Sequence, residues 1–196
     1  MLDPLILRII SIGFASLFLL AAWHKSGNRV QFRGHLLAYQ ILPSAMIPLA
    51  VIAIPLIEFL LGMAWLVTAL LAIRVDLVPL LSTLLLTAYT TAIAINLIRG
   101  RRHIDCGCGF SAVAGMGASD GNTQQLSTGL VIRNIAIIFT ASLANAPVSS
   151  RELGLLDYFS LLTAGIALIL IYAALNQLLA NGSAIEAWTK TLGKSS

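Results

Sequence analysis

The two cysteines of the chain, Cys106 and Cys108, are separated by one glycine and are the residues best suited to chemistry. Two thiols at this spacing can close a very small disulfide ring, and Gly107 gives the backbone the freedom that the ring geometry needs. Such a bond should be strained, and strained disulfides are easily reduced and tend to be catalytic or regulatory. The pair therefore predicts thiol–disulfide exchange.

Basic residues precede this pair closely in the sequence, at Arg101, Arg102 and His103. Positive charge favours the reactive thiolate form of a cysteine, whereas Asp105 opposes that effect. The alternative is a pair of inert thiols at the end of a helix. We favour it less, because inert cysteines have no reason to flank a glycine.

A metal site is a second functional interpretation of the same segment. The soft or borderline ligands there are His103, Cys106 and Cys108, and a fourth ligand would have to come from elsewhere in the chain. The candidates for the fourth ligand are Met116, His24 and His35. The spacing matches no standard zinc pattern, so metal binding ranks below thiol exchange.

The composition defines the surroundings in which this chemistry would occur. Of the 196 residues, 58% are hydrophobic and only 10% are charged, and the mean hydropathy is +0.91. Soluble domains have about a quarter of their residues charged, so the chain is expected to be an integral membrane protein whose partner is the lipid bilayer. The net charge of +4 gives no indication of a nucleic-acid partner.

Long, continuous apolar runs predict helices rather than the short alternating segments of a membrane β-barrel. Five candidate crossings cover residues 4–24, 46–73, 77–98, 129–146 and 157–179. The fourth is marginal in length, and a half-crossing is the alternative for it. Residues 99–128 form a polar, glycine-rich loop that holds both cysteines. The expected fold is an all-α, polytopic membrane helical bundle in one domain, residues 1–196.

Two shorter helices are expected at the membrane surface. Residues 32–42 mix apolar and basic side chains, and residues 184–192 could form an interfacial tail. The three tryptophans are expected to be interface anchors or lipid-facing residues, and they are Trp23, Trp65 and Trp188. His24 and Lys25 are expected to lie at a solvated interface.

Glu58 lies deep within the second apolar run, where an ionisable side chain is costly and is normally functional or paired. Two roles fit this position about equally: a functional acid, or a structural residue that is either neutral and hydrogen-bonded or one half of an intramembrane polar pair with Arg133. Arg133 could instead extend toward the interface from the start of the fourth run.

The basic residues indicate an orientation in the membrane. One side would carry Lys25, Arg29, Arg33, Arg99, Arg101, Arg102, Lys190 and Lys194, and the other only Arg8, Arg74 and Arg151. The side richer in lysine and arginine is normally cytoplasmic. This rule places the N-terminus outside and the cysteine loop in the cytoplasm.

The chain resembles the methylamine utilization protein MauE family over most of its length. The resemblance is carried by Asp105-Cys106-Gly107-Cys108 between the third and fourth runs, by Glu58 in the second run, and by Arg133-Asn134 early in the fourth. It implies a DoxX-like four-helix core with a fifth transmembrane helix added. The broader family has Asp-Cys-Gly-Cys-Phe-Gly, whereas here Gly109 precedes Phe110, and this difference leaves both thiols in place.

The resemblance implies an accessory role in the maturation of methylamine dehydrogenase at the bacterial inner membrane. Cys106 and Cys108 would act with the thioredoxin-like protein MauD in disulfide formation, processing or transport of the small (beta) subunit. The alternative is a non-catalytic scaffold or export helper for the same subunit.

The implied substrate matures in the periplasm, whereas the charge pattern places the thiols in the cytoplasm. Three resolutions remain open: the charge rule fails here, the loop enters the membrane, or electrons cross the bilayer. Two thiols alone cannot relay electrons across a membrane, so the last route needs a second redox group such as a quinone.

Overall fold

A computed structural model describes residues 2–71, 76–101, 128–149, 151 and 153–192 of the chain. Within these residues the fold is entirely helical. The helices are α1 (Pro4–Gly27), α2 (Arg29–Tyr39), α3 (Ile47–Leu71), α4 (Leu77–Ile98), α5 (Thr128–Leu143) and α6 (Leu155–Leu192), and a short 3₁₀ turn, Ser44–Met46, precedes α3. The expected all-α, polytopic membrane fold is confirmed, because four segments, in α1, α3, α4 and α6, are long and apolar enough to cross a membrane.

The observed helices differ from the predicted ranges mainly in the second half of the chain. α4 begins and ends at the predicted residues, but α5 has only 16 residues. At 1.5 Å per residue it is about 24 Å long, which is less than the roughly 30 Å of a bilayer core. α6 has 38 residues and continues to Leu192, so the predicted break before residue 184 does not occur.

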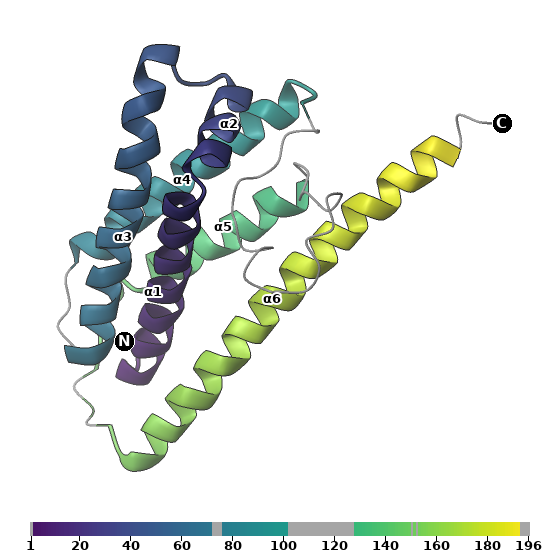
Figure 1. Cartoon of the computed structure of the whole chain (residues 1–196). Coiled ribbons are helices and arrows are strands. Elements are labelled where there is room, and N and C mark those ends of the chain that lie inside the picture. Colours follow the sequence, from purple (N-terminus) through teal and green to yellow (C-terminus); the bar gives the residue numbers. More distant parts are fainter. Residues whose placement is uncertain (1, 72–75, 102–127, 150, 152, 193–196) are drawn as a thin grey trace.

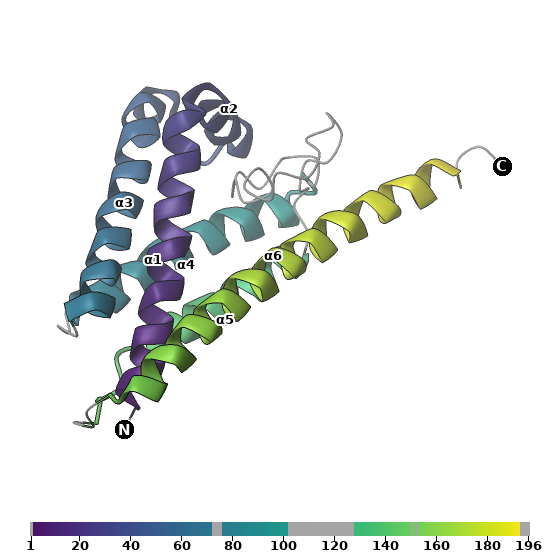
Figure 2. The same cartoon turned by 60° about the horizontal axis from the view of Figure 1, so that its bottom comes forward.

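The helices pack in pairs. α1 lies along α3, and α4 lies along α5, as Figure 1 shows. α6 contacts α1 near its first turns, lies beside Arg133 of α5 at Tyr172, and diverges from the other helices toward its C-terminal end, which is also visible in the second view (Figure 2). The result is a core of four helices, α1, α3, α4 and α5, with α6 alongside it.

The core is built on one face of α1. Its buried residues recur every three or four positions, which places them on a single stripe. They are Leu7, Ile10, Ser11, Phe14, Ala15, Phe18, Ala22 and Lys25. Phe14 stacks on Trp65 of α3, with 5.1 Å between the ring centroids, and this contact joins α1 to α3.

Trp65 is a core residue, so the expectation that it lies at the interface or faces lipid is wrong. Only 1% of its surface is exposed, and its indole Nε1–H donates a 2.8 Å hydrogen bond to Ser82 Oγ on α4. A buried indole needs such an acceptor, because an unpaired N–H inside the bundle is costly. Trp23, in contrast, is 81% exposed, as expected for a side chain that faces lipid or the interface.

Gly62 allows α3 to approach α1 closely. A Cβ atom at this position would lie 2.8 Å from Cγ of Leu19 and 3.1 Å from its backbone nitrogen. Small residues have this role in membrane bundles, where van der Waals packing drives helix association. The α1–α3 interface therefore depends on the missing side chain.

The N-terminal end of α1 is joined to the connection between α5 and α6. The side chain of Asp3 caps α1 by accepting a 2.8 Å hydrogen bond from the backbone N–H of Leu5. The backbone of Leu2 bonds to Pro147 O at 2.7 Å and to Ser149 N at 2.9 Å. Arg151 lies 3.5 Å from Asp3 and 2.8 Å from Asp157. These contacts fix the end of the bundle that lies opposite α2.

Candidate functional site

A polar cluster lies inside the bundle where α1, α3 and α4 meet. Glu58 of α3 is 1% exposed, and its Oε1 forms an ion pair with Nζ of Lys25, which is 7% exposed. Tyr89 of α4 donates a 2.8 Å hydrogen bond from its hydroxyl to the same carboxylate oxygen. Lys25 Nζ also lies 3.4 Å from the Tyr89 oxygen. Three helices thus contribute one side chain each to a neutral, hydrogen-bonded group.

Lys25 is buried because it continues the apolar stripe of α1. It lies seven residues after Phe18 and three after Ala22, so the helix turns it toward α3 rather than toward the surface. Its ammonium group lies 5.4 Å from the ring centre of Phe32 and 4.7 Å from that of Tyr89, which is within cation–π range. The expectation that Lys25 lies at a solvated interface is therefore wrong.

Arg133 is not the ion-pair partner of Glu58, contrary to the hypothesis drawn from the sequence. On α5 its guanidinium donates a 3.2 Å hydrogen bond to Asn134 Oδ1 and lies 5.7 Å from the ring centre of Tyr172 on α6. The reason is helix order, because α3 packs on α1 and thereby brings Lys25 to Glu58. Both Arg133 and Glu58 nevertheless line the same cavity.

That cavity has a volume of about 390 Å³ and is walled mainly by apolar side chains from α1, α2, α4 and α5. Its polar groups are few and come from six helices. They are Lys25, His35, Tyr39, Glu58, Tyr89, Arg133, Asn134 and Tyr172. An apolar cavity with a few converging polar groups is the usual form of a small-molecule site.

Glu58, one of the residues that line this cavity, has an unused hydrogen-bond acceptor. Its Oε1 accepts from Lys25 and Tyr89, whereas Oε2 is buried and has no hydrogen-bond partner within the described part of the chain. A buried carboxylate oxygen without a donor is costly. The cavity can therefore accommodate a group that donates a hydrogen bond.

Cys106 and Cys108, the predicted redox pair, lie outside the described residues, as do His103 and Met116 of the metal hypothesis. The described residues that flank this segment are Arg101, after α4, and Thr128, at the start of α5. Among the residues that the structure describes, no group of three or more His, Cys, Asp or Glu side chains is placed to hold a metal ion.

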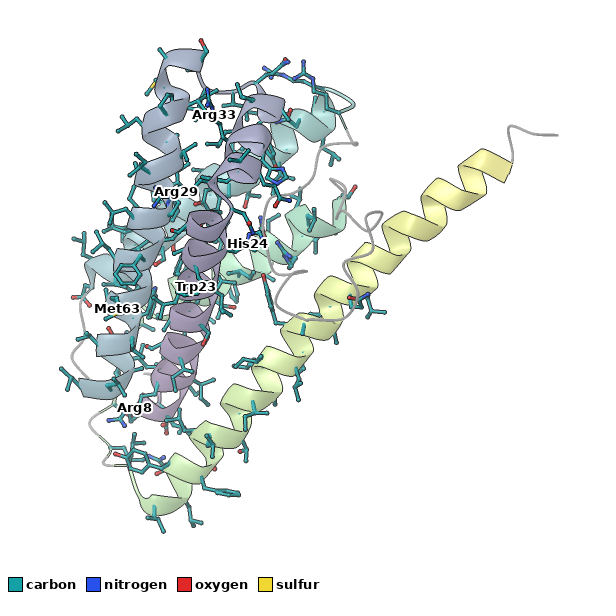
Figure 3. All side chains as sticks on the ribbon, viewed as in Figure 1. Arg8, Trp23, His24, Arg29, Arg33 and Met63 are labelled. Atoms are coloured by element: carbon teal, nitrogen blue, oxygen red, sulfur yellow. The ribbon has the colours of Figure 1, made fainter. Side chains whose placement is uncertain are left out.

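The two ends of the bundle differ in charge. Arg29 and Arg33 of α2 lie toward one end, near His24, and Arg8 lies toward the other, as Figure 3 shows. Arg99 belongs to the first end, because its guanidinium lies 3.5 Å from the carbonyl oxygen of Gln40, just after α2. Lys25 is paired inside the bundle and is therefore not counted among the basic residues at the membrane surface. The count from the sequence becomes seven basic residues on one side against three on the other.

Lys25 and Tyr89 are the functional candidates that sequence reasoning missed. The signal for Lys25 is its position in the buried stripe of α1, since that stripe extends one residue beyond position 24, where the first predicted crossing ends. For Tyr89 no signal in the sequence separated a cluster member from an interfacial tyrosine.

Four apolar helical segments of spanning length, lipid-facing outer surfaces and a buried polar cluster define a polytopic helical membrane protein. The model of one protein family, described as Methylamine utilisation protein MauE, matches residues 3–146, which is most of the chain. The chain belongs to this family. The match covers α1 to α5 and ends before α6.

Individual relatives extend the similarity into α6. A Methylamine utilization protein MauE from Paracoccus denitrificans is 29% identical over 194 residues, which cover 97% of this chain and 96% of the relative. The protein of that name from Paracoccus versutus is 29% identical and covers 90% and 88% of the two chains. A third, from Methylophilus methylotrophus, is 33% identical over 54% of each chain. No solved structure matches the chain.

Proposed function

We propose that this protein is a thiol–disulfide exchange partner in the bacterial inner membrane that supports maturation of methylamine dehydrogenase. Its substrate would be the small subunit of that enzyme, and its partner a thioredoxin-like protein of the MauD type. The observation that carries the proposal is the Cys106-Gly107-Cys108 pair in a chain that belongs to the MauE family.

The chemistry requires only the two thiols and a partner disulfide. The thiolate of one cysteine attacks a partner disulfide, forming a mixed disulfide and releasing one partner thiolate. The second cysteine then attacks the mixed disulfide, closing the Cys106–Cys108 bond and releasing the second partner thiolate. Two electrons move from this chain to the partner, and the reverse sequence oxidises the partner.

The position of the flanking helices supports this role. Arg101 follows α4, and only four residues separate it from Cys106. A chain advances at most about 3.6 Å per residue, so this thiol is tethered within about 20 Å of the end of α4 that adjoins α2. The bundle thus offers a soluble partner a membrane-anchored dithiol.

The test replaces each cysteine in a strain that grows on methylamine. Cys106→Ser and Cys108→Ser should each reduce the amount of folded small subunit and slow growth on methylamine. Ser142→Ala, an exposed α5 side chain with a hydroxyl of similar size, is the matched control and should behave like the wild type. Normal dehydrogenase in both cysteine variants would exclude thiol exchange and leave a scaffold or export role.

A further inference from the structure

The cavity beside Glu58 is a candidate ligand site that the cysteine chemistry does not use. Glu58 is the twelfth of the 25 residues of α3, so its Cα lies about 17–20 Å along the axis from the two ends of that helix. Lys25, in contrast, lies only two residues before the C-terminal end of α1, so the cluster lies between the middle of the bundle and the end that carries α2. The walls of the cavity are mainly apolar, so a ligand there must itself be largely apolar.

An apolar groove on the outer face of α4 adjoins this cavity. It has a volume of about 540 Å³, and three of its lining residues, Ile41, Ala88 and Ala92, also line the cavity. The rest of the groove is formed by α4 side chains that face outward, such as Leu80 and Leu84. A ligand could thus place a polar head in the cavity and an apolar tail in the groove, in contact with lipid.

The polar groups define the head. Glu58 Oε2 lacks a donor, so the ligand must supply an O–H or N–H. Lys25 has three N–H bonds and two recorded acceptors, Glu58 and Tyr89, so it can donate the third to the ligand. A hydroxyl group satisfies both, because it accepts from the ammonium and donates to the carboxylate. A fatty acid carboxylate and a hydrocarbon have no O–H or N–H to donate, so either would leave Oε2 unpaired.

We propose that this cavity binds a membrane quinol, with one ring hydroxyl between Glu58 Oε2 and Lys25 and the apolar tail in the groove of α4. The aromatic rings of Phe32, Tyr39 and Tyr89 give a flat ring apolar walls and faces to pack against. The oxidised quinone has only carbonyl oxygens there, so it can accept from Lys25 but cannot donate to Glu58. The site therefore prefers the reduced form.

The experiment measures binding of decylubiquinol and decylubiquinone to the full chain in lipid nanodiscs, with partition into empty nanodiscs subtracted. We expect saturable binding of one quinol per chain and about tenfold weaker binding of the quinone, the loss expected for a hydrogen bond to a charged group. Glu58→Gln should remove or reverse this preference, because the amide Nε2 donates to a carbonyl. The measurement does not involve the thiols, so its failure would leave the proposed exchange untouched.

A second variant tests the same site if Glu58→Gln does not fold. Ala92→Phe puts a ring where the cavity meets the groove, so it should abolish saturable binding. Ala167→Phe is the matched control, because Ala167 is an exposed alanine of α6 that lines neither space, and it should bind like the wild type. Unchanged binding in Ala92→Phe, equal binding of both redox forms, or a cavity filled only by phospholipid would overturn the proposal.

Discussion

Lys25, near the C-terminal end of α1, forms a buried ion pair with Glu58, at the middle of α3. The pair joins the two helices that pack most closely, and Tyr89 extends it to α4. Both charges are removed from solvent, so each depends on the other for compensation. The pair therefore fixes the relative position of three helices and shapes the cavity beside it.

Removal of one charge should destabilise the bundle more than removal of both. Lys25→Met leaves the Glu58 carboxylate buried without its cation, a change that costs about 3–5 kcal/mol in buried pairs. The double variant Lys25→Met/Glu58→Gln leaves no uncompensated charge and should recover part of that loss. Thermal unfolding of the purified variants in detergent measures both effects. A double variant less stable than Lys25→Met would contradict the pairing.

Ser82 should contribute to stability through its acceptance of the Trp65 indole N–H. Ser82→Ala leaves that buried donor unsatisfied, which costs about 1–3 kcal/mol. Thr87→Ala is the comparison within the same helix, because Thr87 is exposed and its hydroxyl bonds only to the carbonyl of Thr83. Both variants can be compared by thermal unfolding in detergent. If they lower the unfolding temperature equally, the Trp65–Ser82 bond has no special role.

Gly62→Ala should weaken the contact between α1 and α3. The new Cβ would lie 2.8 Å from Cγ of Leu19, and overpacking of this kind costs about 1–3 kcal/mol. Gly13→Ala is the matched control, since a Cβ at Gly13 meets no atom within 4 Å and alanine favours a helix. The measurement is residual folded protein after heating, by size-exclusion chromatography. Equal behaviour of the two variants would contradict the close approach at Gly62.

The distribution of basic residues predicts the side of the membrane on which the thiols lie. With Lys25 removed from the count, seven basic residues still face three, so Cys106 and Cys108 should be cytoplasmic. A membrane-impermeant maleimide should then label them in inverted vesicles and not in intact spheroplasts. A cysteine introduced at Arg151, at the opposite end, provides the control with the reverse pattern. Labelling of the native thiols in spheroplasts would contradict this orientation and would place them on the side where the proposed substrate matures, so that no second redox group would be needed.

The fold could be predicted from hydropathy because a membrane imposes long apolar runs. α4 has the predicted bounds for this reason, and Asp3 with Pro4 marks the start of α1. α5 and α6 were less predictable, because the ends of apolar runs do not tell where a helix ends. α6 continues through Asn181 and Gly182, two residues that would favour a break.

The site was less predictable, because its partners are far apart in the sequence. Glu58 stood out as a buried acid, but the choice between Lys25 and Arg133 depended on which helices pack together. Lys25 lies 33 residues from Glu58, and only the rotation of α1 turns it inward. Trp65 was misplaced for a similar reason, since its burial depends on contacts with Phe14 and Ser82.

Trapping of a mixed disulfide tests the proposed thiol exchange most directly. Cys106→Ser and Cys108→Ser each leave one thiol without its resolving partner, so the variant that keeps the attacking cysteine should accumulate a covalent adduct. Cells grown on methylamine would be quenched in acid and analysed on non-reducing gels. We expect an adduct with the thioredoxin-like partner in one single variant, lost on reduction and in the double variant. No reductant-sensitive adduct in either variant would contradict thiol exchange.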